Sequence, residues 1–258
     1  MGNETINTDL GHWLLSKMGK KVLRPGGRQL TQQLLTGLDI TEEDKVIEFA
    51  PGIGWTMAQV LKYKPRSYTG IELNGEATRM LREKLNGTGG KIIQGDASRV
   101  DLPDGSATKL YGEAMLTMQA DQRKSRIIKE AFRLLEKGGR YGVHELGLMP
   151  NDISTETKTE IQRELAKTIH VNARPLTRAE WVALFEKEGF RVKEIFTNPM
   201  LLLEAGRVLD DEGLFRSLKI GFNIFTHPYA KKRILHMRKV FRKYKKEMNA
   251  IAIIAEKP

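Results

Sequence analysis

The sequence predicts an α/β protein in which a mostly parallel β-sheet is covered by helices on both faces. From residue 27 onward, short apolar runs of strand length alternate with longer runs of helical spacing. At residues 45–61, KVIEFAPGIGWTMAQVL, one apolar run breaks at Pro51, passes two glycines and resumes with helical spacing at Met57. This strand, turn and helix order is the repeating unit of a parallel sheet with crossover helices.

The remaining elements follow in order along the chain. Strands are expected at 46–50, 67–73, 91–96, 107–115, 140–148, 191–203 and 249–257. Helices are expected at 27–36, 76–85, 123–135 and about 153–170, with one more directly after the glycine turn. A further helix is expected to be capped by Thr177 and ended by Gly189, because threonine satisfies free N–H groups and glycine adopts the terminating conformation.

Composition limits the class of protein and the chemistry open to it. The chain has 258 residues, 40% of them hydrophobic, which suits one large α/β domain or one domain with an appendage. It has no cysteine, which excludes disulfides, thiolate metal sites and cysteine nucleophiles. The N-terminus is unlike a signal peptide, and no apolar run reaches the roughly 18 residues that span a bilayer. We therefore expect a cytoplasmic protein with no metal.

The chain is basic, with a net charge of +11. Much of the excess lies in YAKKRILHMRKVFRKYKKEM, residues 229–248, which predicts an amphipathic helix. Its apolar positions are Ile234, Met237, Phe241, Tyr244 and Met248. The stripe is expected to pack on the domain. The basic positions of 231–246 are either a solvated helix face or a weak contact for an anionic membrane or RNA.

The glycine turn suits an anionic or carboxylate-bearing ligand, because free backbone N–H groups and the helix dipole point at it. The dinucleotide fingerprint G-x-G-x-x-G is not matched. Ala50 stands at its first glycine, and its third position is not glycine. No G-K-[ST] follows either, so a pyrophosphate or P-loop ligand is disfavoured.

Three acids end three successive strands: Glu48, Glu72 and Asp96. Alone, each is more often a helix cap or a loop residue, but a carboxylate at Glu72 can accept hydrogen bonds from both hydroxyls of a ribose. With its acid, E-F-A-P-G-I-G resembles the first motif of the class I S-adenosylmethionine-dependent methyltransferases, which have a Rossmann-like fold. GSATKLYGEAMLTM and EAFRLLEKGGRYGVHEL are similar to the fourth strand, helix and fifth strand of the small-molecule methyltransferases of ubiquinone and menaquinone biosynthesis.

The resemblance implies a seven-stranded, mostly parallel sheet with an antiparallel last strand, and S-adenosylmethionine as cofactor. It divides the chain into an N-terminal helical cap (1–26), a cofactor-binding core (27–204), a basic helical insertion (205–248) and the last core strand (249–258). The cofactor-binding residues that it implies are Glu48, Ala50, Gly52, Gly54, Glu72, Leu73, Asp96, Ala97 and Glu113. The sequence departs from the family at Ala50, in the long insertion, and in having Glu113 instead of the commoner aspartate.

Residues at the ends of the fourth and fifth strands are candidates for handling the methyl acceptor. His144 is the first choice for a general base because imidazole titrates near neutrality, and Glu113 is a second candidate. The alternative is that His144 is an interior residue. Met115 and Met118 either line an apolar acceptor pocket or pack in the core. A small-molecule or lipid-like acceptor is expected; an RNA methyltransferase and a non-catalytic cofactor-binding module are the alternatives.

Overall fold

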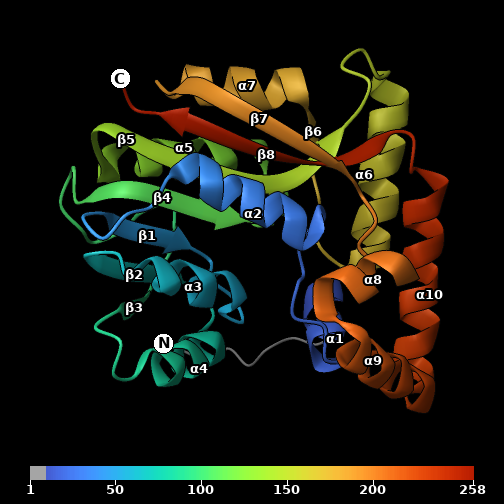
Figure 1. The fold of residues 1–258 in the computed structure, drawn as a ribbon. Helices are drawn as coiled ribbons and strands as arrows, with labels where there is room; N and C mark the ends of the chain where they lie inside the picture. The colour runs from blue at the N-terminus through green and yellow to red at the C-terminus, as the bar shows by residue number, and fades with distance from the viewer. Residues whose placement is uncertain (1–9) are drawn as a thin grey trace.

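The computed structural model describes residues 10–258 and has a central, twisted β-sheet at its core (Figure 1). The strand order is β3-β2-β1-β4-β5-β8-β7, and the short β6 pairs with β5. The strands are β1 Lys45–Phe49, β2 Ser67–Glu72, β3 Lys91–Gln94, β4 Ala107–Glu113, β5 Leu135–Leu148, β6 Leu176–Thr177, β7 Arg191–Pro199 and β8 Met248–Glu256. Only β8 runs antiparallel to its neighbours, β5 and β7. The predicted fold class is confirmed; β6 adds an eighth, two-residue strand.

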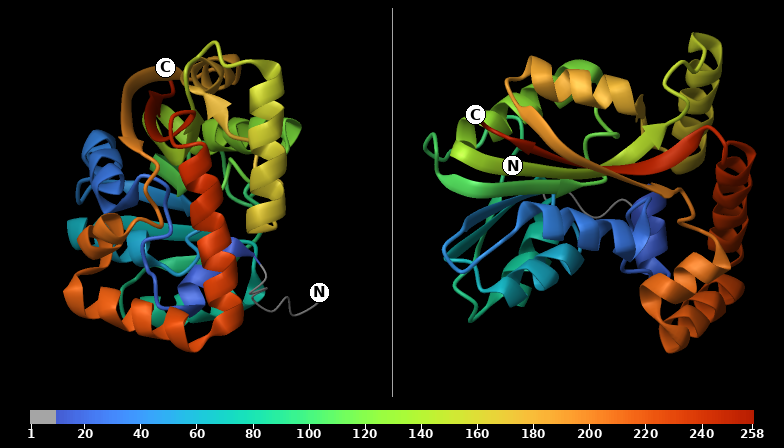
Figure 2. Two further views of the ribbon diagram at one scale, coloured as in Figure 1. Left: turned by 90° about the vertical axis from the view of Figure 1, so that its right-hand side faces the viewer. Right: turned by 45° about the horizontal axis from the view of Figure 1, so that its top comes forward.

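Helices cover both faces of the sheet (Figures 1 and 2). They are α1 Gly11–Lys17, α2 Gly27–Leu38, α3 Trp55–Val60, η1 Leu61–Tyr63, α4 Gly75–Leu85, α5 Asp121–Leu134, α6 Thr155–Ile169, α7 Arg178–Lys187, α8 Ala205–Glu212, α9 Leu214–Thr226 and α10 Pro228–Lys243. One apolar core joins the sheet to α5 and α7, and another joins it to α2, α3 and α4. This sandwich buries the central strands on both sides, as their apolar sequences require.

The ends of α7 follow from its sequence. Thr177 and Glu180 form a capping box, in which each side chain accepts a hydrogen bond from the other residue's backbone N–H. Gly189, just past the last turn, has a φ of +95°, which is costly for a residue with a Cβ. Both predicted boundaries of this helix are confirmed.

Three helices, α8, α9 and α10, lie between β7 and β8 and form a layer beside α1 and α6 at one end of the sheet (Figures 1 and 2). The apolar stripe of α10 is buried against α1 and α6, as predicted. The prediction that Met248 continues this stripe is wrong, because α10 ends at Lys243 and Met248 begins β8, where it pairs with Leu148. Among the residues described, no helix is both long and apolar enough to cross a bilayer.

Candidate cofactor and active site

A cavity of about 400 Å³ opens where β1, β2, β3 and β4 end, and α1 closes its far side. This is the usual ligand position in an open α/β sheet, since the ends of parallel strands leave a crevice there. Seven of the nine predicted cofactor-binding residues line the cavity together, and so do Met115 and Met118: the seven are Ala50, Gly52, Glu72, Leu73, Asp96, Ala97 and Glu113. Glu48, Gly54 and His144 are not among the lining residues.

Glu72 is held rigidly at the end of β2. Its carboxylate accepts hydrogen bonds from the backbone N–H of Gly52, at 3.0 Å, and of Asn74, at 2.9 Å. Burial raises the pKa of Glu72, and the backbone donors partly oppose that rise. A carboxylate has about four acceptor positions, so two fixed bonds leave capacity for two ligand hydroxyls. The geometry therefore suits the ribose contact that the resemblance implies.

The glycine turn fits a ligand that approaches the backbone closely. Gly52 has a φ of +59°, and a Cβ built there would meet only the Ala50 carbonyl oxygen, at 3.9 Å. Ala50 itself has a φ of +52°, which a residue with a Cβ adopts at a cost of about 1–2 kcal/mol. Gly54 serves packing, because a Cβ there would lie 2.7 Å from the side chain of Leu81 on α4. Gly54 thus supports the turn from behind the cavity.

Asp96 lies beyond β3, next to a cation. Its Oδ2 accepts a hydrogen bond from Nη2 of Arg123 at 3.0 Å, and its Oδ1 accepts two from Ser98. Burial would raise the pKa of Asp96, but the Ser98 bonds and the Arg123 charge lower it below its usual value. Arg123 lies on α5 and lines the cavity, a role that sequence reasoning missed because helical arginines are common on surfaces.

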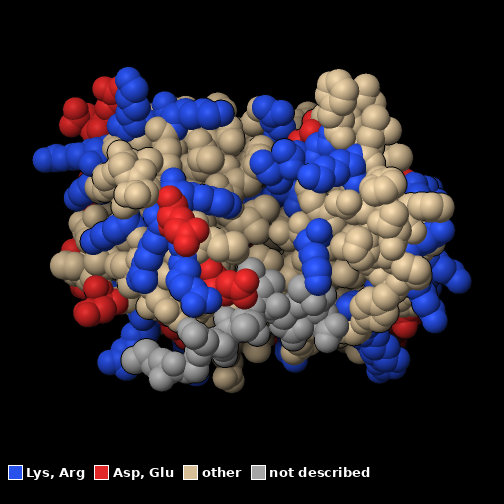
Figure 3. Space-filling view, turned by 90° about the horizontal axis from the view of Figure 1, so that it is seen from below, with Lys and Arg blue, Asp and Glu red and all other residues tan. Residues whose placement is uncertain are grey.

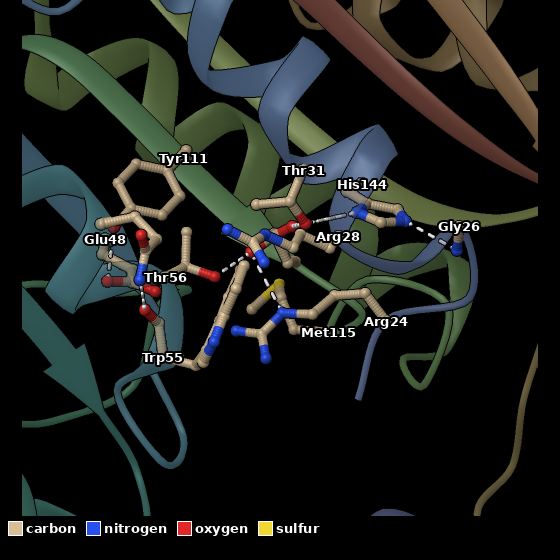
Figure 4. Close-up of polar contacts among 12 residues, drawn as sticks. Arg24, Gly26, Arg28, Thr31, Glu48, Trp55, Thr56, Tyr111, Met115 and His144 are labelled. Atoms are coloured by element: carbon tan, nitrogen blue, oxygen red, sulfur yellow. Dashed lines mark hydrogen bonds and ion pairs between the residues drawn. The ribbon is translucent and has the colours of Figure 1, made fainter. Parts of the chain in front are cut away.

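Glu113 is the centre of a buried polar cluster, whose other members Arg24, Thr31, Thr56 and His144 are labelled in Figure 4. Its two oxygens accept hydrogen bonds from Nε of Arg24 at 3.1 Å, from the hydroxyls of Thr31 and Thr56 at 2.5 Å each, and from His144 Nδ1 at 2.9 Å. Burial alone would raise the pKa of Glu113, but the Arg24 charge and the His144 bond hold it at about 2. The cluster ties the loop before α2 to the end of β4.

His144 is not positioned to act as the predicted general base. Its Nε2 accepts the backbone N–H of Gly26 at 3.0 Å, so its proton lies on Nδ1 and points to Glu113 (Figure 4). The side chain is fully buried and does not line the cavity. Because both ring nitrogens are engaged within the protein, no lone pair faces an acceptor. The interior role that the sequence analysis held open is the one that the structure supports.

Glu48 lies among protein groups and not at the cavity. Its Oε2 accepts hydrogen bonds from the hydroxyls of Tyr68 and Tyr111, which come from the two neighbouring strands. Burial, partly opposed by these bonds, raises the pKa of Glu48 to about 7. Glu48, the acid of the first motif, therefore links β1 to β2 and β4 beneath the turn. It does not line the cavity.

We expect Glu48 to make stability depend on pH. Because the pKa of Glu48 is raised in the folded state, its contribution to folding stability is fully present below the ordinary carboxyl pKa. This contribution is lost as pH rises through about 7. Glu48→Gln removes the charge at nearly constant volume, so it should stabilise the protein relative to wild type at about pH 8 and have little effect at about pH 5. Urea unfolding at both pH values measures this. An equal difference at the two would contradict it.

The N-terminal segment forms the far wall of the cavity. On α1, His12 and Trp13 line it, and Arg24 lines it from the loop that follows. Burial lowers the pKa of His12 to about 4. This loop, residues 18–26, is fixed by α8: Asp211 pairs with the buried Lys20, and Glu212 accepts the backbone N–H groups of Lys21 and Val22. Sequence reasoning expected a cap here but did not find His12.

Comparisons with known proteins agree with this geometry. Residues 46–139 match the family model described as a methyltransferase domain. An uncharacterized protein of Haemophilus influenzae is 31% identical over 253 residues, covering 96% of this chain and 98% of that protein. The uncharacterized methyltransferase YdaC of Bacillus subtilis is 26% identical over 123 residues, covering 47% of this chain and 67% of that protein.

Solved structures share the fold. The [4+2]-cyclase SpnF superposes with a TM-score of 0.73 at 16% identity, covering 97% of this chain and 94% of that one. Geranyl diphosphate C-methyltransferase from Streptomyces coelicolor, solved with Mg²⁺, geranyl diphosphate and S-adenosylhomocysteine, gives a TM-score of 0.65 at 12% identity, covering 89% and 80%. The chain belongs to the class I S-adenosylmethionine-dependent methyltransferases, a family whose cofactor is S-adenosylmethionine. The finer similarity to ubiquinone and menaquinone enzymes stays a prediction.

Proposed function

We propose that the protein transfers the methyl group of S-adenosylmethionine to a small apolar or amphipathic acceptor. The observation that supports this most is that the cavity has two chemically different walls. Glu72 and Asp96 make one wall polar, as a nucleoside requires. The remaining wall is rich in apolar side chains, including Leu10, Trp13, Leu23, Met115, Met118 and Val171.

The residues divide the work as follows. When bound, the cofactor would supply a sulfonium methyl group that an acceptor lone pair attacks in line, with the thioether sulfur as leaving group, so the chain's main task is alignment. Glu72 and the turn at Gly52 hold the nucleoside and its tail, and Met115 and Met118 contact the acceptor. His12 lines the cavity as a neutral ring at neutral pH, since burial lowers its pKa to about 4, and so adds no charge where an apolar acceptor would lie. The cap on α1 keeps water from the reacting atoms.

The acceptor can be identified by tracing a labelled methyl group from the cofactor into cell-extract fractions. Purified protein is incubated with S-adenosylmethionine labelled in its methyl group and with cell extract separated into polar small-molecule, organic-soluble and RNA fractions. The proposal predicts label in the organic-soluble fraction. Label in RNA would support the alternative that the basic insertion binds RNA, and cofactor binding with no transfer to any fraction would contradict the proposal.

A charge on the apolar wall should separate acceptor binding from cofactor binding. Met118→Asp should lower methyl transfer by about tenfold or more, because a carboxylate there has to be desolvated by the acceptor, while affinity for S-adenosylhomocysteine stays within about twofold. Met149→Asp is the matched control, since Met149 is exposed and lies outside the cavity. Unchanged methyl transfer by Met118→Asp would show that Met118 does not contact the acceptor.

A further inference from the structure

Helix α9 exposes a continuous row of large apolar side chains. Leu214, Leu218, Phe222 and Phe225 recur at three- and four-residue steps, and Tyr229 continues the row on α10. With the neighbouring Phe215 they form what we call the α9 stripe. Exposure reaches 67% at Phe222, 72% at Phe225 and 86% at Phe215. Scattered exposed apolar residues are ordinary, but six along one helix and its continuation mark a binding surface.

The opposite face of α9 packs on the rest of the protein. Ile220 is buried, and the side-chain amide of Asn223 donates a hydrogen bond to the Met18 carbonyl at 3.0 Å. Ile224 contacts the apolar cluster shared by α1, α6 and α10. The helix therefore already has its partner within the domain, and the α9 stripe is its outer face. Rotating α9 about its axis to bury the stripe would expose Ile220, Asn223 and Ile224.

The charge around the stripe is of one sign. Between Glu212 and Glu247 the sequence has 11 lysines and arginines and no aspartate or glutamate. The rest of the chain has 32 basic and 32 acidic residues, so the whole net charge of +11 comes from this segment. Seen from below, the part of the surface over α9 and α10 has few charged side chains at its centre, with Lys and Arg along its edge (Figure 3). Part of this charge is compensated, because Arg238 and Arg242 pair with Glu204, Lys243 pairs with Glu160, and Arg216 pairs with Glu212.

We propose that the α9 stripe docks on the surface of an anionic lipid bilayer. An exposed apolar helix face with aromatic side chains and flanking lysines is suited to the boundary between headgroups and acyl chains. Each lysine near an anionic leaflet strengthens binding about fivefold. A second copy of this chain fits the stripe less well, because its own basic segment would face this one and the like charges would repel. RNA would use the charge but leave the leucines of the stripe without a partner.

Docking through α9 would place the cavity near the membrane. Asn223 and Ile220 contact Met18 and Gly19 at the end of α1, and the same helix brings Trp13 to the apolar wall. Membrane docking goes beyond the proposed methyl transfer and does not depend on it, because vesicle binding is measured without cofactor or acceptor.

Vesicle flotation of the full chain tests the proposal. Wild-type protein should float with vesicles of phosphatidylcholine and phosphatidylglycerol, and much less with phosphatidylcholine alone. Phe222→Ser/Phe225→Ser should lower the partition coefficient about a hundredfold, because each buried phenylalanine contributes at least about tenfold. Lys219→Gln/Lys231→Gln/Lys232→Gln should lower it about fivefold per lysine, and salt should weaken binding of the wild type.

Matched substitutions outside the insertion are the controls. Tyr63→Ser removes an exposed aromatic side chain on η1, and Lys62→Gln removes an exposed charge beside it; both should float like wild type. All variants change exposed side chains, and far-UV circular dichroism checks that they are folded. No flotation of wild type, or flotation unchanged by the two phenylalanine substitutions, would overturn the proposal. Salt-sensitive RNA binding or a dimer that depends on Phe222, with no vesicle binding, would overturn it too.

Discussion

Replacing Glu72 by alanine should lower the affinity for S-adenosylhomocysteine by at least about a hundredfold, because two hydrogen bonds to a charged group contribute about 1.5–3 kcal/mol each. The carboxylate is 6% exposed and is aimed by the N–H groups of Gly52 and Asn74, so it is ordered before the ligand arrives. Isothermal titration calorimetry measures the effect.

Two further variants separate the ligand contact from damage to the turn. Glu72→Gln keeps the side-chain volume and one acceptor oxygen, so it should bind at an intermediate affinity. Glu83→Ala on α4 removes an equal charge from an exposed position and should bind like wild type. If Glu72→Ala bound the ligand as tightly as wild type, the ribose assignment would be wrong.

Replacing Glu113 by alanine should lower the free energy of unfolding by about 3–5 kcal/mol, the usual effect of leaving one partner of a buried ion pair uncompensated. Arg24 is 6% exposed, and Thr31, Thr56 and His144 would lose their shared acceptor as well. Urea unfolding at neutral pH measures the loss. Glu136→Ala is the control, because its pair with Lys45 is at the surface and should contribute less than about 1 kcal/mol.

The same variant makes a prediction about acid. The pKa of Glu113 is depressed in the folded state, so its contribution is full above the ordinary carboxyl value and is lost as pH falls towards about 2. Wild type should therefore lose stability more steeply than Glu113→Ala between about pH 4.5 and about pH 2. Parallel curves for the two proteins would show that Glu113 is not the group whose protonation loosens the cluster.

The sequence was informative where position along a strand decides function. Glu72, Asp96 and Glu113 were found because the ends of parallel strands meet at one edge, whatever the order of the strands. Glu48 was misplaced because its partners, Tyr68 and Tyr111, lie on other strands, and only the register of the sheet brings them beside it. His144 looked like a base because its Gly26 partner lies 118 residues away in the chain.

Periodicity located the basic helix of the insertion, α10, but not α8 or α9, and it did not show which apolar face is covered. Both α9 and α10 have apolar residues at helical spacing, yet Met237 and Phe241 are buried while Phe222 and Phe225 are exposed. Tertiary contacts decide this: α10 lies along α6, whereas α9 meets α1 with its other side. For the same reason the sequence drew attention to the charge of residues 231–246 and not to the stripe that precedes it.

The helical insertion supports the loop that forms one wall of the cavity. Asp211 and Glu212 at the end of α8 bind Lys20 and the backbone of residues 21, 22 and 28, and the loop that they hold brings Arg24 to Glu113. The long insertion before the last strand, which is a departure from the family, therefore supports the cavity wall formed by α1 and the loop that follows it.

The most direct test of a cofactor site between Glu72 and Asp96 is calorimetric titration of the purified wild-type protein with S-adenosylmethionine, S-adenosylhomocysteine and NAD in parallel. The structure predicts that both sulfur compounds bind at one site per chain and that NAD does not, since the turn at Ala50 and Gly52 lacks the third glycine of a pyrophosphate site. Binding of NAD alone would contradict the account and leave the strand-end acids without an explanation.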